Sequence, residues 1–275
     1  ASGVKVTWKE VTGAEGYNVY RKSGSGSYKY IGKTSKLYYT DKTAKSGTTY
    51  TYTVKAYKSK TESSYNSGLS CKYLAAPKAE TKVYTSSINL SWDEIRGAKE
   101  YAVYRKASGE SKWTKLTTTT KTSYKDTNVK NNKTYSYRVK AVNGKTVSSY
   151  STVKQLFLST PKLSSVKNTN VGVEFKWSKV SGAKGYKVYR KTGSGDFKLI
   201  ATTKKTTYTD ETVKTGTVYT YSVKAYNDNA TSYYNKTGLK LRYVSTTALY
   251  YPDNVENGVQ LRFHAADKAD KYYIY

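Results

Sequence analysis

Apolar and polar residues alternate strictly in short runs along the chain. Val4, Val6 and Trp8 fall on one face of such a run, and Lys5 and Thr7 fall on the other. This period of two is typical of a half-buried β-strand. No segment shows sustained helical periodicity, and clusters of Gly, Ser, Thr, Asn and Asp separate the runs. The pattern therefore predicts an all-β chain of short antiparallel strands.

The alternating runs repeat along the sequence. Related runs end at Trp8, Trp92, Trp177 and Phe263, so successive repeats are 84, 85 and 86 residues apart. The first three of these runs are each followed by one that opens Tyr-x-Val-Tyr-Arg-Lys and later by one of the pattern Tyr-x-Tyr-x-Val-Lys-Ala. Self-similarity at a fixed period indicates an array of repeated units. We therefore interpret the chain as a tandem array and not as one large domain.

Each repeat has room for about seven short strands, which predicts a sandwich of two antiparallel sheets. The repeats divide the chain into a module that lacks its first strand (1–75), two complete modules (76–160 and 161–246) and the N-terminal part of a fourth module (247–275). The junctions at Pro77 and Pro161 are short and have no Gly/Ser-rich hinge. A semi-rigid rod is therefore expected.

The predicted cores depend on aromatic residues at repeated positions. Tyr is abundant, with 32 residues against 4 Phe and 4 Trp. Its ring can be buried while its hydroxyl keeps a polar partner, which explains how a chain with only 37% hydrophobic residues builds a core. The expected core positions are Trp8, Trp92, Trp177, Phe263, Tyr50, Tyr135 and Tyr219.

These motifs resemble those of fibronectin type III domains. The family has a Trp on its second strand and a Tyr-rich third strand, and the turn from Val213 to Tyr219 is similar to its Leu-x-Pro-Gly-Thr-x-Tyr corner. The resemblance implies a tandem array of fibronectin type III-like, immunoglobulin-like β-sandwiches. It also implies that Tyr50, Tyr135 and Tyr219 are corner tyrosines whose hydroxyls bond back to the chain. The corner Pro is missing here, so a looser corner is expected.

The Tyr-, Lys- and Thr-rich composition of the repeats is similar to that of repeats in large surface and secreted proteins of Gram-positive bacteria. This resemblance implies an extracellular location, at the cell surface or in the cell wall.

The charge of the chain is strongly positive. Lys and Arg number 48 against 19 Asp and Glu, which gives a formal net charge of +29, and the excess is spread evenly over the three main modules. Such a chain attracts polyanions. Two interpretations stay open: Lys-rich faces that only maintain solubility and block edge pairing, or faces that bind anionic cell-wall polymers. No nucleic-acid motif is present, and no specific nucleic-acid partner is expected.

Two sets of aromatic residues are candidates for ligand binding. One ring follows each Gly-rich or Ser-rich hairpin turn, and another follows a Ser near the start of the last strand. An exposed ring beside Lys can stack on a sugar ring or a cation. The alternative is a purely structural role in clamping the sheet. The candidates are Tyr28, Trp113 and Phe197 in the first set and Tyr65, Tyr150 and Tyr233 in the second.

The sequence argues against catalysis. One Cys and one His are too few for a zinc site of these residues or for most Ser/His/Asp and Cys/His schemes. Asp41, Asp126 and Asp210 recur once per module, whereas a glycosidase needs two facing carboxylates. We expect these side chains to accept turn N–H groups. The prediction is therefore no enzyme activity, no catalytic, metal-binding or cofactor-binding residue, and no transmembrane segment.

Two functions stay open at this point. The first is a non-catalytic extracellular repeat segment that acts as a semi-rigid spacer, stalk or filament component of a bacterial surface protein. The alternative is an adhesion or binding module for anionic cell-wall polymers or glycans, through Lys-rich faces and exposed aromatic rings. For the incomplete terminal modules the sequence leaves two interpretations open: a fragment of a longer repeat array, or self-association in which the ends of two copies complete one another by strand exchange.

Overall fold

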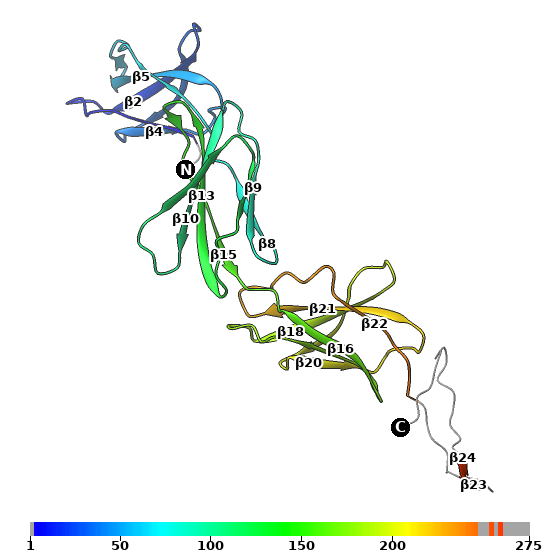
Figure 1. Cartoon of the computed structure of the whole chain (residues 1–275). Helices are drawn as coiled ribbons and strands as arrows, with labels where there is room; N and C mark the ends of the chain where they lie inside the picture. The colour runs from blue at the N-terminus through cyan, green and yellow to red at the C-terminus, as the bar shows by residue number, and fades with distance from the viewer. Residues whose placement is uncertain (1–2, 247–252, 256–257, 261–275) are drawn as a thin grey trace. The chain divides into compact units, whose positions relative to one another are not determined.

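The computed structural model describes residues 3–246, 253–255 and 258–260, and every helix or strand element within them is a β-strand. Three groups of strands follow one another along the chain (Figure 1), and each has a smaller and a larger sheet. We call them module one (β1–β7), module two (β8–β15) and module three (β16–β22). A further hairpin pairs β23 (Asp253–Val255) with β24 (Gly258–Gln260). The predicted fold class, a tandem array of fibronectin type III-like β-sandwiches, is confirmed.

Module one combines a two-stranded and a five-stranded sheet. In the smaller sheet β1 pairs antiparallel with β4, with Val4 opposite Asp41. In the larger sheet the order is β3-β2-β5-β6, and β7 also pairs with β5. The strands are β1 (Val4–Thr7), β2 (Gly16–Ser23), β3 (Lys29–Thr34), β4 (Tyr38–Asp41), β5 (Thr49–Lys58), β6 (Thr61–Glu62) and β7 (Leu69–Lys72).

Module two has the same plan with an additional strand in its smaller sheet. The smaller sheet has the order β12-β9-β8, and the larger sheet has the order β11-β10-β13-β14, with β15 also paired to β13. The strands are β8 (Ala79–Val83), β9 (Ile88–Trp92), β10 (Glu100–Ala107), β11 (Thr114–Thr119), β12 (Ser123–Asp126), β13 (Lys133–Asn143), β14 (Thr146–Val147) and β15 (Ser151–Phe157).

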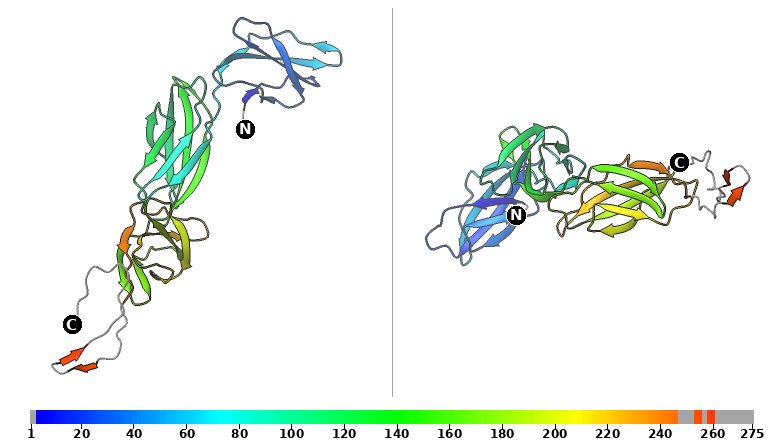
Figure 2. Two further views of the ribbon diagram at one scale, coloured as in Figure 1. Left: turned by 90° about the vertical axis from the view of Figure 1, so that its right-hand side faces the viewer. Right: turned by 60° about the horizontal axis from the view of Figure 1, so that its bottom comes forward.

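Module three repeats this arrangement, and its two sheets can be followed from two further directions in Figure 2. The smaller sheet has the order β16-β17-β20, and the larger sheet has the order β19-β18-β21-β22. The strands are β16 (Leu163–Thr169), β17 (Gly172–Trp177), β18 (Gly185–Thr192), β19 (Lys198–Thr203), β20 (Thr207–Asp210), β21 (Val218–Tyr226) and β22 (Leu239–Arg242).

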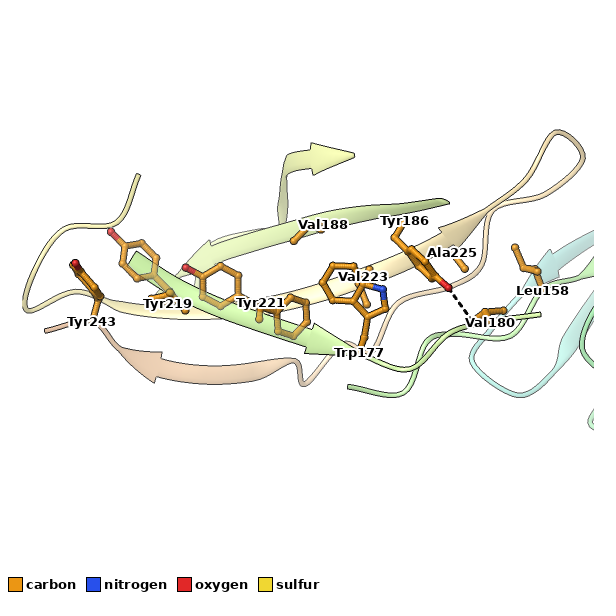
Figure 3. Close-up of a cluster of buried hydrophobic side chains, with 12 residues drawn as sticks. Leu158, Trp177, Val180, Tyr186, Val188, Tyr219, Tyr221, Val223, Ala225 and Tyr243 are labelled. Carbon is orange, nitrogen blue, oxygen red and sulfur yellow. Dashed lines mark hydrogen bonds between the residues drawn. The ribbon is translucent and has the colours of Figure 1, made fainter. Parts of the chain in front are cut away.

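The core of module three lies between its two sheets (Figure 3). Alternate residues of β17 and β21 point inward, as the period of a strand requires. The ring of Phe175 lies 5.2 Å from that of Trp177 and 5.6 Å from that of Tyr221, measured between centroids. The Trp177 ring also meets Tyr186 of β18 at 5.5 Å. Aromatic packing therefore joins the two sheets.

The structure buries most of the expected core positions. Trp92, Trp177, Tyr50, Tyr135 and Tyr219 are all less than a tenth exposed. Trp8 is only half-buried, and Phe263 lies outside the described residues.

The corner tyrosines bond back to the chain. The Tyr50 hydroxyl accepts the backbone N–H of Lys45 at 3.0 Å, and the Tyr219 hydroxyl accepts that of Lys214 at 2.9 Å. These bonds satisfy a turn N–H and a buried hydroxyl together, so the turn is held without the family's corner Pro.

A buried carboxylate links the sheets of module one. Asp41 on β4 accepts the backbone N–H of Thr43 at 2.9 Å, which is the turn contact expected from the sequence. It also accepts the Tyr52 hydroxyl of β5 at 2.8 Å and pairs with Arg21 of β2 at 2.6 Å. Burial alone would raise the pKa of Asp41, but hydrogen bonds from Thr43, Tyr52 and Arg21 hold it below its ordinary value.

Candidate binding face

The outer face of the larger sheet is the candidate functional surface. On β2, Tyr17 and Val19 are buried in the core, so alternation places Tyr20 and Lys22 on the opposite, outer side. On β5 the same alternation places Lys55 outward. We define the aromatic face by five positions, which in module one are Tyr20, Lys22, Tyr28, Lys55 and Tyr65. The corresponding residues are Tyr104, Lys106, Trp113, Lys140 and Tyr150 in module two, and Tyr189, Lys191, Phe197, Lys224 and Tyr234 in module three.

In module one, Tyr65 lies at the centre of the aromatic face. Its ring meets Tyr20 edge-on at 5.2 Å and stacks on Tyr28 at the same centroid distance. The ammonium of Lys55 lies 4.2 Å from the Tyr65 centroid, and that of Lys22 lies 4.9 Å from the Tyr28 centroid. Such cation–π contacts hold the cations against the sheet. Tyr65 keeps 45% of its surface exposed, so the ring is available to a ligand.

An acidic residue partly neutralises the face in module one. Glu62 pairs with Lys55 at 3.3 Å and also accepts the amide of Asn18. The Asn18 hydrogen bond and the nearby Lys55 hold the pKa of Glu62 below its ordinary value. Burial, together with the Glu62 charge, raises the pKa of Tyr20. The aromatic face of module one is therefore less cationic than its lysines alone would make it.

Module two adds a guanidinium to its aromatic face. Tyr104 meets Tyr150 edge-on at 5.7 Å, and Lys140 lies 5.4 Å from the Tyr150 centroid. An additional cation, Arg138, stacks over Trp113 at 4.1 Å and lies 5.2 Å from the Tyr150 centroid. Tyr150 is 44% exposed. Two cations therefore flank one accessible ring.

Module three adds a second tyrosine to the same arrangement. Tyr234 stacks on Tyr189 at 5.8 Å and meets Phe197 edge-on at 5.2 Å. Tyr233 stacks in turn on Tyr234 at 5.4 Å. Lys224 lies 4.7 Å from the Tyr234 centroid, and burial together with the charge of Lys187 lowers its pKa. Burial also raises the pKa of Tyr189, and the nearby Tyr234 raises it further.

The structure brings the two sets of aromatic candidates together in module one, where Tyr28 contacts Tyr65. In module three Phe197 contacts Tyr234, which follows the candidate Tyr233 in the sequence. In module two Arg138 bridges Trp113 and Tyr150. Arg138 and the outward-facing Tyr20 and Lys55 are not among the residues predicted from the sequence.

One candidate was assigned to the wrong register. The backbone N–H of Ser232 bonds to Ala225, as Ser63 bonds to Ala56 in module one. Two residues further along, Tyr234 and not Tyr233 is the counterpart of Tyr65. Tyr233 extends the face by stacking, while Tyr234 makes the contacts with β18.

No group of three or more His, Cys, Asp or Glu side chains within the described ranges could hold a metal ion. The described part of the chain also has no helix able to cross a membrane. The repeated Asp positions are instead occupied in structural contacts: Asp126 accepts the N–H of Asn128 at 3.0 Å, and Asp210 accepts that of Thr212 at 3.1 Å.

A family model described as a PBP1-like, fibronectin3-like domain matches residues 79–151. No curated protein matches. Among solved structures, the chicken CNTN1 FN1–FN3 domains are 18% identical, with 86% of this chain and 92% of that chain covered and a TM-score of 0.32. The chicken interferon gamma receptor alpha chain is 14% identical, with 61% and 97% covered and a TM-score of 0.37.

The family match falls on module two and supports its fibronectin type III-like character. Repeat domains of this type are structural or binding modules, are typically non-catalytic and are commonly extracellular.

Proposed function

We propose that this chain is a non-catalytic segment of an extracellular protein that binds an anionic polymer through the aromatic faces of its modules. The observation that carries the proposal is the recurrence of the same five positions, with rings and cations in contact, in all three modules. A core role does not require this recurrence, because these side chains lie on the opposite side of the sheet from the core.

The chemistry of the face suits a polymer that carries both negative groups and aliphatic C–H surfaces, which sugar rings and polyol backbones both offer to an aromatic ring. Lys and Arg held over aromatic rings keep N–H groups free for phosphates or carboxylates. The exposed rings of Tyr65 and Tyr150 offer flat surfaces for stacking. A net charge of +29 attracts such a polymer over a long range.

Repetition of the aromatic face along the chain strengthens binding to a polymer. A polymer bound to one module meets the next face at a high effective concentration, so weak single contacts add up to strong binding. Anionic cell-wall polymers, such as poly(glycerol phosphate), have the repeated charge that this arrangement favours. A location at the cell surface or in the cell wall belongs to the same proposal.

The test is a salt titration of binding by the complete 275-residue chain. Poly(glycerol phosphate), neutral dextran and a single-stranded oligothymidylate serve as probes. We expect poly(glycerol phosphate) to bind, with affinity falling steeply between about 50 and 200 mM NaCl. Absence of binding at low salt would reject the proposal, and so would stronger binding to dextran or to the oligonucleotide.

A pair of matched variants separates the aromatic face from general charge. Lys140→Gln removes one cation from the aromatic face of module two, and Lys125→Gln removes one from the exposed side of β12 in the smaller sheet. We expect the first to weaken binding several-fold and the second to have little effect. Equal effects would mean that net charge alone attracts the polymer.

A second candidate function is a mechanical spacer. The contacts that favour it are the buried Arg21–Asp41–Tyr52 and Arg190–Asp210–Tyr221 networks, which tie the two sheets of their modules together. A spacer needs modules that resist unfolding under force, and it needs no ligand. Single-molecule stretching of the chain should then give separate unfolding steps for the modules. In the Asp210→Ala variant the unfolding force should decrease in only one of these steps. A chain that extends without discrete steps would contradict this role.

A further inference from the structure

One outward position of the larger sheet differs in kind between the modules. It lies opposite the outward tyrosine of the neighbouring strand, and it is occupied by Thr53 in module one, Ser222 in module three and Arg138 in module two. Module two therefore carries a guanidinium on its aromatic face where the other two modules carry a small hydroxyl.

The small hydroxyls have a structural role. Thr53 is 2% exposed and donates to Oδ1 of Asn66 at 2.9 Å. Ser222 is fully buried and donates to the backbone carbonyl of Asn235 at 2.8 Å. In modules one and three this position therefore fastens the segment that precedes the last strand to the sheet.

Arg138 does not take over this fastening role. The residue of module two that corresponds to Asn66 and Asn235 is Ser151. Within residues 3–246, Nε of Arg138 and Oγ of Ser151 are both buried and have no hydrogen-bond partner. Buried polar atoms without a partner are rare in folded proteins, so this pair of positions is not explained by the stability of the sheet.

Aromatic rings hold the guanidinium in place. It lies 4.1 Å from the ring centroid of Trp113 and 5.2 Å from that of Tyr150. A guanidinium that stacks on a ring uses its flat faces for this contact and keeps the N–H groups at its edges for a bidentate ligand. Tyr150 is 44% exposed, so a ligand can reach this place from solvent.

Two lysines add positive charge at the same rings. The ammonium of Lys106 lies 5.5 Å from the Trp113 centroid, and that of Lys140 lies 5.4 Å from the Tyr150 centroid. Three cations from two neighbouring strands therefore share two aromatic rings.

No acidic residue neutralises these three cations. In module one Lys55, the counterpart of Lys140, forms an ion pair with Glu62. In module two Val147 occupies the position of Glu62 in the short strand after the turn. Across the described part of module two, none of the three cations forms an ion pair with a carboxylate. Their charge is thus available to an anionic ligand.

We propose that the guanidinium of Arg138 and the ammonium groups of Lys106 and Lys140 form a site in module two for the phosphomonoester group of a sugar phosphate. The proposal rests on the binding function proposed above for the aromatic faces, and it assigns a ligand class to one of them. A phosphomonoester carries a charge of about −1.5 to −2 at pH 7, so it matches three unpaired cations better than a singly charged group does. Its oxygens fit the fork of the guanidinium, and the sugar ring stacks on Tyr150.

The test measures the binding of glucose 6-phosphate to the complete 275-residue chain. Titration calorimetry in a phosphate-free buffer with about 50 mM NaCl gives the affinity. Nuclear magnetic resonance locates the site, because the chain has four Trp residues and therefore four indole N–H signals. The signal that is lost in Trp113→Phe belongs to Trp113, and module three already has Phe197 at this position. We expect this signal to shift on titration and the other three to stay in place.

Three further probes separate the features of the ligand. Glucose 6-sulfate has the same sugar with a single negative charge, and we expect it to bind several-fold more weakly than glucose 6-phosphate. Glycerol 3-phosphate keeps the phosphomonoester but has no ring, and it should also bind several-fold more weakly. Glucose, which has no charge, should show no measurable binding.

Matched variants of the chain isolate the guanidinium. Arg138→Ser introduces the residue that module three has at this position, and it should weaken binding of glucose 6-phosphate about tenfold or more. Arg138→Lys keeps the charge but loses the planar fork, so it should weaken binding several-fold. Lys125→Gln removes a cation from the exposed side of β12 and should leave binding unchanged. Circular dichroism checks that each variant is folded.

Several outcomes would overturn the proposed site. Among them are equal binding by the parent chain and Arg138→Ser, equal binding of glucose 6-sulfate or glycerol 3-phosphate, and a titration in which the Trp113 signal does not shift. If poly(glycerol phosphate) binds and glucose 6-phosphate does not, this site is wrong while the proposed polymer binding stands. If neither binds, the function proposed for the aromatic faces fails as well.

Discussion

Nη1 of Arg21 lies 2.6 Å from Oδ2 of Asp41, and this contact joins the larger sheet of module one to its smaller sheet. The equivalent atoms of Arg190 and Asp210 are 2.7 Å apart in module three. The carboxylate is almost completely buried in both cases, while the guanidinium keeps about a fifth of its surface exposed. The pair is thus a property of the repeat, and it makes the separation of the sheets costly.

Removal of the Asp210 carboxylate should strongly destabilise module three. The Asp210→Ala variant leaves Arg190 and the Tyr221 hydroxyl without their shared partner. Loss of one member of a buried pair typically costs about 3–5 kcal/mol in the free energy of unfolding. Urea denaturation followed by circular dichroism measures this change.

The matched control is Asp228→Ala in the same module. Asp228 pairs with Lys184, and both side chains are about two-thirds exposed. An exposed pair contributes at most about 1 kcal/mol, so this variant should unfold almost as the parent does. Similar losses for the two variants would contradict the structural role assigned to Asp210.

The chain should lose stability in acid. Burial acts to raise the pKa values of Asp41 and Asp210, but the hydrogen bonds from Thr, Tyr and Arg outweigh it and lower both. The folded pKa is then below the unfolded one, so the unfolded state takes up protons first as the pH falls. The stabilisation is present above about pH 4 and is lost below it. Melting temperatures measured from pH 7 down to pH 2 should show this decline, and Asp210→Asn should flatten it for module three.

Alkaline pH should also destabilise the Arg–Asp–Tyr networks of modules one and three. Burial and the hydrogen bond to the adjacent Asp raise the pKa values of Tyr52 and Tyr221. The folded state therefore keeps these phenols neutral where the unfolded state would ionise them, and stability falls as the pH rises above about 10. Absorbance at the phenolate band should show a group of tyrosines that ionise only on unfolding. In Tyr221→Phe the alkaline loss in module three should shrink, and an unchanged loss would contradict this assignment.

The sequence predicted the architecture well because strand alternation and repetition are local signals. The inward positions of Trp92, Trp177 and Tyr219 follow directly from the period of two within their runs. The Arg21–Asp41 contact could not be found in this way, since it joins residues 20 positions apart that meet only when the two sheets face each other. The alternation that predicts the core also places Tyr20 and Lys55 outward, so these two positions were available to sequence reasoning and were missed.

The assignment of Tyr233 failed for a different reason. A Ser-Tyr pair occurs at Ser64, at Ser149 and at Ser232, and the letters alone align the three tyrosines. The ladder hydrogen bond between Ser232 and Ala225 places the aligned position two residues after Ser232, which is Tyr234. The register of a segment that follows a turn is determined by its backbone hydrogen bonds. In module three two tyrosines stand next to each other, so the sequence alone does not show which of them is the counterpart of Tyr65.

The contribution of each tryptophan to the free energy of unfolding should depend on how deeply its side chain is buried. Trp177 is 3% exposed, whereas Trp8 is half-buried. Trp177→Ala should therefore cost about 3–5 kcal/mol in the free energy of unfolding of module three, as buried Trp truncations do. Trp92→Ala should cost a similar amount in module two, because Trp92 is 6% exposed. Trp8→Ala should cost clearly less in module one, because water already reaches part of the indole. Chemical denaturation with hydrogen exchange resolves the three modules, and a loss at Trp8 as large as that at Trp177 would contradict this dependence on burial.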